Sequence, residues 1–227
     1  MDARLMELCS VLVREEEVRG KRVLDVGSYD INGSFRTVLE PMHPSLYLGV
    51  DMESGKGVDM VVNVHDLSTT FEANSFDIVI STEAIEHIED WRSAVNQIKG
   101  MVKVGGMLLL TSRSLGFGYH AYPDDHWRYE LNDIRDIFPP ESWGIEVLTE
   151  DMYRGDHYGF FLKAWKKNNF VNDLSRIALY HIKTDRRMHL NNSLHIEGIT
   201  GEIKPRRITS TSDLTELEQH PPFDYWI

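Results

Sequence analysis

Ionisable side chains that could perform acid–base or metal chemistry cluster in two segments of this 227-residue chain. In the first segment Glu83, Glu86 and His87 stand at spacings i, i+3 and i+4, which would bring them to one face of a helix. Two carboxylates and an imidazole suit a hard divalent ion such as Mg²⁺ or Mn²⁺. The alternative is that the first glutamate borders a ligand without any metal and that His87 packs behind the cleft.

The second segment, residues 112–129, is rich in aromatic and ionisable groups and contains His120 and His126. Histidine suits proton removal because its unperturbed pKa of about 6.5 lies near the working pH. We therefore predict that His120 or His126 is a catalytic base. Arg128 with Asp124 or Asp125 would orient the substrate that loses the proton. Either histidine could instead be structural, held by hydrogen bonds in a packed loop, and His120 could be a fourth metal ligand.

A glycine-bearing turn between two predicted strands would bind a nucleotide-like ligand. Residues 22–27 indicate a buried strand, and residues 46–51 a second strand that ends in Asp51. Asp25 suits a cationic group such as an ammonium, Gly27 lets a ligand approach the backbone, and Asp51 can accept both hydroxyls of a ribose. The Gly-x-Gly-x-x-Gly turn of dinucleotide-binding proteins is absent and Tyr29 would crowd a pyrophosphate, so a nicotinamide-dependent dehydrogenase is a weaker alternative.

Strand and helix signals alternate along the chain. Further strands are predicted at 58–63, 76–81, 106–112, 145–149 and 158–166, and helices at 3–19, from 33, at 90–103 and at 130–138. This order predicts an α/β fold, a Rossmann-like seven-stranded and mostly parallel sheet with helices on both faces, whose last strand is antiparallel. The carboxyl ends of its strands would gather the groups described above around one cleft.

Five motifs in this order, within residues 20–166, resemble those of class I S-adenosylmethionine-dependent methyltransferases of the small-molecule branch. They are the turn at 23–33, the acid at 51, and the segments 76–81, 82–88 and 103–111. The resemblance implies S-adenosylmethionine as cofactor, with Asp66 meeting the adenine amino group and the backbone N–H of Leu67 meeting the ring. The cofactor-binding residues implied are Asp25, Gly27, Ser28, Tyr29, Gly33, Asp51, Met52, Asp66, Leu67, Ser81 and Glu83.

Two further likenesses bear on the acceptor. The Glu-x-x-Glu-His of residues 83–87 is similar to a metal-binding motif of small-RNA 3′-terminal 2′-O-methyltransferases and ubiquinone-pathway O-methyltransferases. Residues 122–129 look like a segment of methyltransferases associated with glycan modification. We expect an S-adenosylmethionine-dependent O-methyltransferase acting on a small-molecule or saccharide hydroxyl. The alternatives are an RNA 2′-O-methyltransferase and a catalytically silent scaffold with this fold.

The charge and composition of the chain exclude several classes of partner and site. A formal net charge of −12 argues against nonspecific nucleic-acid binding, and no apolar run reaches the ~20 residues needed to span a membrane. Cys9 is the single cysteine, which excludes an intramolecular disulfide and a cysteine zinc cluster, so a cytoplasmic location is expected.

Three regions are expected along the chain: residues 1–20 as a helix packed on the domain, 21–166 as the cofactor-binding domain, and 167–227 as a C-terminal arm. The arm would begin with a helix over 170–182 and lie across its own domain or across a partner subunit in a homodimer.

Overall fold

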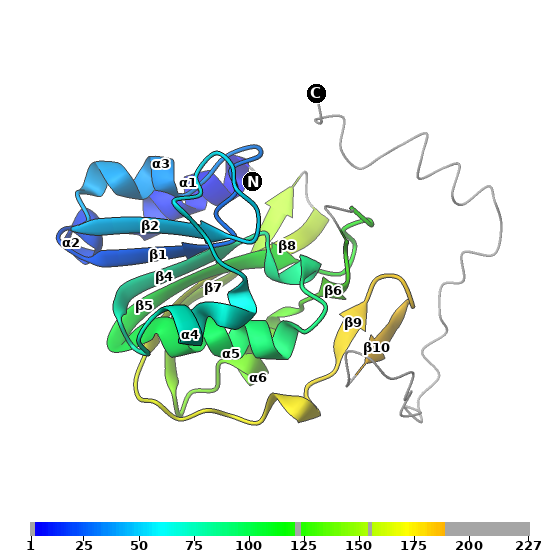
Figure 1. Ribbon diagram of the computed structural model, residues 1–227. Helices are drawn as coiled ribbons and strands as arrows, with labels where there is room; N and C mark the ends of the chain where they lie inside the picture. The colour runs from blue at the N-terminus through cyan, green and yellow to red at the C-terminus, as the bar shows by residue number, and fades with distance from the viewer. Residues whose placement is uncertain (1–2, 121–123, 154–155, 189–227) are drawn as a thin grey trace.

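A seven-stranded sheet forms the centre of the computed structural model, which describes residues 3–120, 124–153 and 156–188 (Figure 1). The strand order is β3-β2-β1-β4-β5-β8-β7, and β8 alone runs in the direction opposite to the other six strands. The strands are β1 (Arg22–Val26), β2 (Leu46–Asp51), β3 (Met60–Val61), β4 (Phe76–Thr82), β5 (Val102–Arg113), β7 (Trp143–Tyr153) and β8 (Asp156–Lys166). The predicted Rossmann-like fold is therefore confirmed.

Helices cover both faces of the sheet (Figure 1). One face carries α1 (Ala3–Leu12), α2 (Glu15–Val18) and α3 (Arg36–Leu39), and the other carries α4 (Leu67–Thr70), α5 (Trp91–Met101) and α6 (Leu131–Ile137). Side chains alternate between the faces along each strand, so Ile78 and Ile80 of β4 pack with α1 while Val79 packs with α5. Because both faces are covered, the middle of β4, Ile78–Ile80, and most of β1 consist of buried apolar residues.

Local turns shorten several predicted elements. The predicted helix 3–19 is two helices, because Arg14 is extended and its backbone N–H donates to the Glu17 carboxylate, which starts α2. The helix after Gly33 is one turn, continued by the 3-10 turn η1 (Glu40–Met42). The third strand keeps only Met60 and Val61, which lie exposed at the edge of the sheet.

The chain after β8 departs most from expectation. The helix predicted over 170–182 is wrong: a 3-10 turn, η4 (Leu174–Arg176), leads into a hairpin of β9 (Leu179–His181) and β10 (Arg186–Met188). Arg92 of α5 donates to the carbonyls of Leu174 and Ile177, which an α-helix would have used internally. The structure thus replaces helical hydrogen bonds with tertiary ones.

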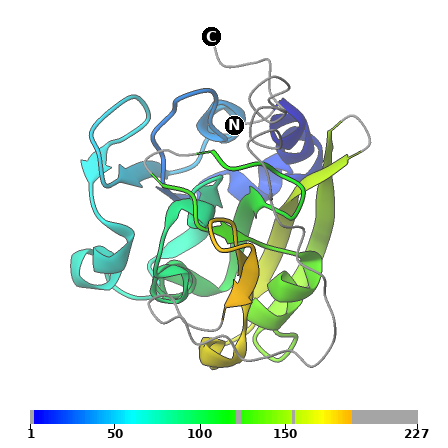
Figure 2. The same cartoon turned by 90° about the vertical axis from the view of Figure 1, so that its right-hand side faces the viewer.

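The hairpin extends a second, three-stranded sheet of order β10-β9-β6, where β6 is Trp127–Arg128 (Figure 2). This attaches residues 179–188 to the segment that follows β5. The expected arm beyond residue 188, and the homodimer expected through it, lie outside the described residues. Within the described ranges, no helix has the length and apolarity needed to cross a membrane.

Candidate functional site

A cavity of about 690 Å³ lies at the carboxyl ends of the parallel strands, where open α/β sheets bind ligands. Its wall is formed by the segments that follow β1, β2, β3, β4 and β5. The segments after β1 and β2 bring acids, small residues and backbone turns to the wall, and the segments after β4 and β5 bring three histidines: His87, His120 and His126.

The turn after β1 brings backbone close to the loop after β4. Gly27 has a φ of +78°, and a Cβ at this position would lie 2.6 Å from the Cβ of Ala84, so only glycine fits. Gly33 also has a positive φ, +128°, and its N–H donates to Asp30. Ser28 is buried in this turn, and its Oγ has no hydrogen-bond partner among the described residues.

Asp25 lies at the floor of the cavity. Its Oδ2 accepts a 2.8 Å hydrogen bond from the Tyr47 hydroxyl, while its buried Oδ1 has no partner among the described residues. Burial raises the pKa of Asp25 to about 6, against the opposing effects of the Tyr47 hydrogen bond and the Arg36 charge. An unshared carboxylate oxygen in such a place is a receptor for a cationic group.

Asp51 ends β2 on the rim of the cavity. Its carboxylate accepts hydrogen bonds from the backbone N–H groups of Tyr29 at 3.2 Å and Glu53 at 3.1 Å. These bonds fix the carboxylate where the first two parallel strands end. Met52, next along the chain, is 60% exposed on the same rim.

The structure does not bring Asp66 and Leu67 to the cavity. Leu67 is wholly buried in the core, and Asp66 precedes α4, where its carbonyl accepts from Thr69 and Thr70. Because β3 ends at residue 61 instead of 63, the residues that line the cavity come earlier in the chain: Asn63, Val64 and His65. Asn63 was missed, although a polar residue close to the carboxyl end of a parallel strand is the signal that could have found it.

The predicted convergence of Glu83 with Glu86 and His87 is also wrong. Residues 85–87 form a 3-10 turn, η3 (Ile85–His87), instead of a helix, and Glu83 lies before it with a φ of +51°. The Glu83 carboxylate accepts from Thr111 at 3.1 Å and pairs with Arg113. Ser81, next to these groups, is buried with no partner for its Oγ among the described residues.

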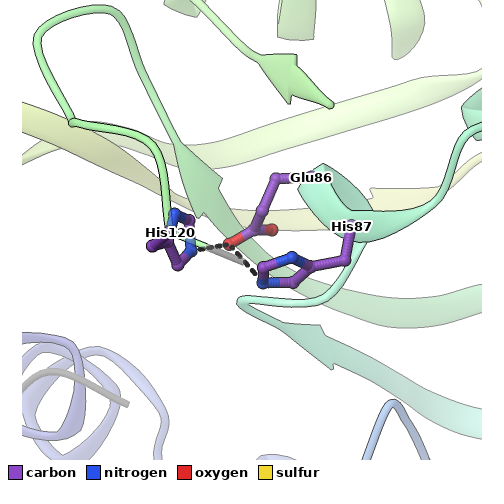
Figure 3. A group of neighbouring side chains, drawn as sticks. All are labelled: Glu86, His87 and His120. Atoms are coloured by element: carbon purple, nitrogen blue, oxygen red, sulfur yellow. Dashed lines mark ion pairs between the residues drawn. The ribbon is translucent and has the colours of Figure 1, made fainter. Parts of the chain in front are cut away.

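Glu86 and His87 instead meet His120, from the segment after β5 (Figure 3). The Nε2 atoms of the two histidines each lie 3.9 Å from Glu86 Oε1, and their ring centroids are 4.8 Å apart. Glu86 is wholly buried, and its Oε2 accepts a 2.7 Å hydrogen bond from Ser112. We call these three residues the Glu86–His87–His120 cluster.

Arg128 and Asp125 hold the segment after β5 in place. Both are fully buried and joined by two hydrogen bonds of 2.6 Å, and Arg128 also donates to the carbonyls of Phe117 and Gly118. Burial alone would raise the pKa of Asp125, but hydrogen bonds from Arg128 and His120 hold it well below its usual range. Contrary to expectation, neither residue lines the cavity; Asp125 positions His120, through its backbone N–H at 2.9 Å and its Nδ1 at 3.0 Å.

His126 lies at the cavity wall against the β9–β10 hairpin. Its ring centroid is 5.8 Å from that of His181 in β9, and burial together with the charge of Lys183 lowers its pKa. Lys183, in the turn of the hairpin, donates to Asp124 on the cavity rim at 2.6 Å. The β9–β10 hairpin therefore packs against the part of the cavity wall that contains His126.

Comparison with known proteins identifies the family. The family model described as "Methyltransferase domain" matches residues 1–150. The chain belongs to the class I S-adenosylmethionine-dependent methyltransferases. It is 30% identical over 153 residues to phosphoethanolamine N-methyltransferase 2 of Caenorhabditis elegans, an alignment that covers 59% of this chain and 34% of the relative. This methyltransferase chain thus spans about a third of the length of that curated relative.

Solved structures share the fold of this methyltransferase. An S-adenosylmethionine-dependent methyltransferase from Mesorhizobium loti has a TM-score of 0.56 at 15% identity, covering 72% of this chain and 98% of that chain. The 1,6-didemethyltoxoflavin-N1-methyltransferase of Burkholderia thailandensis, solved with 1,6-didemethyltoxoflavin and S-adenosylhomocysteine, has a TM-score of 0.54 at 13% identity, covering 73% and 79%.

The cavity of this methyltransferase fits the family's cofactor. S-adenosylmethionine carries an amino acid and a ribose, and the cavity offers a buried unshared carboxylate oxygen at Asp25 and a fixed carboxylate at Asp51. The hydroxyls of Ser28 and Ser81 are buried without partners among the described residues, and Gly27 leaves space that a Cβ would close. Polar atoms left in this state are the ones a polar ligand would satisfy.

Proposed function

We propose that the protein transfers a methyl group from S-adenosylmethionine to a hydroxyl of a small-molecule or saccharide acceptor. The observation that carries the proposal is the composition of one cavity. Groups that suit the cofactor come from the segments after β1 and β2, and imidazoles that can accept a proton come from the segments after β4 and β5. An amine acceptor that is neutral at working pH would not need a deprotonating group, whereas a hydroxyl does.

On the cofactor side, Asp25 would accept the ammonium of the methionine part and Asp51 the ribose hydroxyls. Asn63, Val64 and His65 would border the adenine. Ser81 and Glu83 would flank the methionine end, where the pairing with Arg113 holds the Glu83 carboxylate in place. Each role is supported by the position of the residue on the cavity wall.

On the acceptor side, the chain must hold a hydroxyl oxygen in line with the methyl group and remove its proton. When bound, the cofactor supplies a methyl group attached to a sulfonium. The neutral thioether that leaves needs no protonation by an acid. The Glu86–His87–His120 cluster would receive the hydroxyl, and Asp125 keeps the His120 ring oriented. His126 is a second imidazole on the same wall and is the comparison residue for any test of His120.

The charges of the cavity support a neutral or cationic acceptor over RNA. The wall carries six acids and one arginine, Arg113, which is paired with Glu83; the acids are Asp25, Asp51, Glu53, Glu83, Glu89 and Asp124. In the β9–β10 hairpin, Lys183 pairs with Asp124 and Arg187 with Asp133. A polyanion gains affinity mainly from cations that neutralise its phosphates, and few described cations face this cavity.

A second candidate function is methyl transfer to an amine. It is favoured by the 30% identity to a phosphoethanolamine N-methyltransferase and by the acidic wall, which would attract an ammonium. The two functions are separated by the atom that receives the methyl group.

The test is incubation of the full chain with ¹³C-methyl S-adenosylmethionine and a panel of sugars, small alcohols, ethanolamine and phosphoethanolamine. We expect an O-methyl carbon resonance that is absent for Asp51→Ala. A labelled N-methyl product would establish the second candidate instead. Cofactor binding without transfer to any acceptor would favour the catalytically silent scaffold.

A further inference from the structure

The Glu86–His87–His120 cluster places three potential ligand atoms around one small space. These atoms all lie within 4.8 Å of one another, and Figure 3 shows both imidazoles turned toward the Glu86 carboxylate. The Nε2 atoms are each 3.9 Å from Oε1, which is too long for a hydrogen bond. Two ligands that each lie about 2.0–2.2 Å from one ion are at most about 4.4 Å apart, so the two 3.9 Å separations fit and the widest separation in the cluster would close by a few tenths of an ångström on binding.

The polar contacts of the outer ring nitrogens indicate which nitrogen of each imidazole carries the proton. His87 Nδ1 lies 2.5 Å from the carbonyl oxygen of Asp124, which can only accept, so Nδ1 must carry the proton. His120 Nδ1 lies 3.0 Å from Oδ2 of Asp125 without the alignment of a hydrogen bond, and the negative charge of that carboxylate favours the proton on Nδ1. With each proton on Nδ1, both Nε2 lone pairs are left on the side of the Glu86 carboxylate (Figure 3).

Glu86 contributes a second, independent observation. The residue is wholly buried, its Oε2 is satisfied by Ser112, and its Oε1 has no hydrogen-bond partner among the described residues. A buried anionic oxygen facing two lone pairs is unfavourable unless a positive charge lies between them. The space between the three atoms is thus shaped for a cation.

We propose that Glu86, His87 and His120 bind one divalent transition-metal ion. The donor set is two imidazole nitrogens and one carboxylate oxygen, which suits Mn²⁺, Fe²⁺, Co²⁺ or Zn²⁺ better than Mg²⁺, an ion that prefers oxygen ligands throughout. Asp125, Ser112 and the Asp124 carbonyl hold the ligands from outside, as the partners of metal-bound histidines and carboxylates commonly do. Glu83, expected as a ligand from its spacing, is replaced by His120.

Three protein ligands leave positions open for a substrate oxygen. In its catalytic part the inference rests on the proposed function: with His87 and His120 as ligands, the ion would take the place of an imidazole base, bind the acceptor hydroxyl and lower its pKa, so that the proton leaves to water. The metal site itself does not depend on that function, because its ligands are all residues of this chain.

The test measures metal binding by the full, metal-stripped chain without cofactor or acceptor. Mn²⁺ is titrated by calorimetry and by the loss of its free-ion electron paramagnetic resonance signal, and Co²⁺ by its visible absorption. We expect one ion per chain. Glu86→Gln and His120→Asn should each weaken binding at least ~100-fold, and Ser112→Ala, which removes the hydrogen bond that holds the Glu86 carboxylate in place, about tenfold.

Two matched controls replace the same residue types outside the cluster. Glu83→Gln and His126→Asn should leave the metal affinity within about twofold, and thermal unfolding reports whether each variant is folded. Equal Mn²⁺ binding by the native chain and Glu86→Gln, or no binding of Mn²⁺, Co²⁺ or Zn²⁺, would overturn the inference. Loss of binding in Glu83→Gln with retention in His120→Asn would overturn the ligand set. None of these outcomes bears on methyl transfer, which the labelled-methyl assay tests separately.

Discussion

Asp25 should make cofactor affinity depend on pH and should also destabilise the empty protein. Its pKa is raised to about 6 by burial, and we propose that only its charged form accepts the cofactor ammonium. With that value, about nine-tenths of the groups are charged at pH 7 and about one-tenth at pH 5. Affinity for S-adenosylhomocysteine should therefore fall about tenfold between pH 7 and pH 5.

The stability of the empty protein should depend on pH in the opposite direction to the cofactor affinity. A carboxyl whose pKa is higher in the folded state than its ordinary 3.8 stabilises the fold below about pH 4, and this contribution is lost as the pH rises through 6. The difference corresponds to about 3 kcal/mol above pH 7. Asp25→Asn removes the buried charge, so the empty variant should be more stable than the native chain at pH 7, by up to that amount, and equal to it at pH 4.

Calorimetric titration between pH 5 and pH 8 and urea unfolding of the empty protein measure the two effects. Tyr47→Phe is the matched variant: it removes the hydrogen bond to the charged carboxylate, so the midpoint of the affinity profile should move above pH 6. An affinity that does not change between pH 5 and pH 8, or an Asp25→Asn protein that is less stable than the native chain at pH 7, would refute the reasoning.

Three further substitutions test the parts that position the site. Gly27→Ala forces a Cβ to 2.6 Å from Ala84 at a positive φ; it should cost about 1–3 kcal/mol in urea unfolding and abolish S-adenosylhomocysteine binding. Arg128→Met leaves the buried Asp125 carboxylate without its arginine partner, so the free energy of unfolding should fall by about 3–5 kcal/mol; an unchanged value would contradict the buried pair. Lys183→Ala removes the exposed contact of the hairpin with Asp124 on the cavity rim. It should raise KM for the acceptor and leave thermal unfolding and cofactor affinity unchanged, and an unchanged KM would separate the hairpin from the site.

The sequence predicted the parts of the fold that depend on local pattern. The strand expected at 46–51 is β2 as observed, and the strand expected at 76–81 is one residue longer. Both are runs of mostly apolar residues in a parallel sheet covered on both faces, where the pattern is strongest. The same pattern located Asp25, Gly27 and Asp51, because they lie at the ends of the first two predicted strands.

What the sequence could not predict depends on contacts between distant segments. The β9–β10 hairpin forms where a helix was expected, because Arg92 and β6 supply its hydrogen bonds. Asp125 and Arg128 face each other inside the protein instead of facing an acceptor, since no local signal reports their burial. His120 joins Glu86 only through the path of the segment after β5. The site thus combines locally encoded strand ends with a wall set by tertiary packing.

Binding of the cofactor product tests the central claim most directly. The native chain and Asp51→Ala are titrated with S-adenosylhomocysteine at pH 7.5 by calorimetry, with NADH as the competing ligand class. We expect one site of micromolar affinity in the native chain, binding at least tenfold weaker in the variant, and no heat with NADH. Preference for NADH, or S-adenosylhomocysteine binding that is unaffected by Asp51→Ala, would contradict the account of this cavity as a methyltransferase cofactor site.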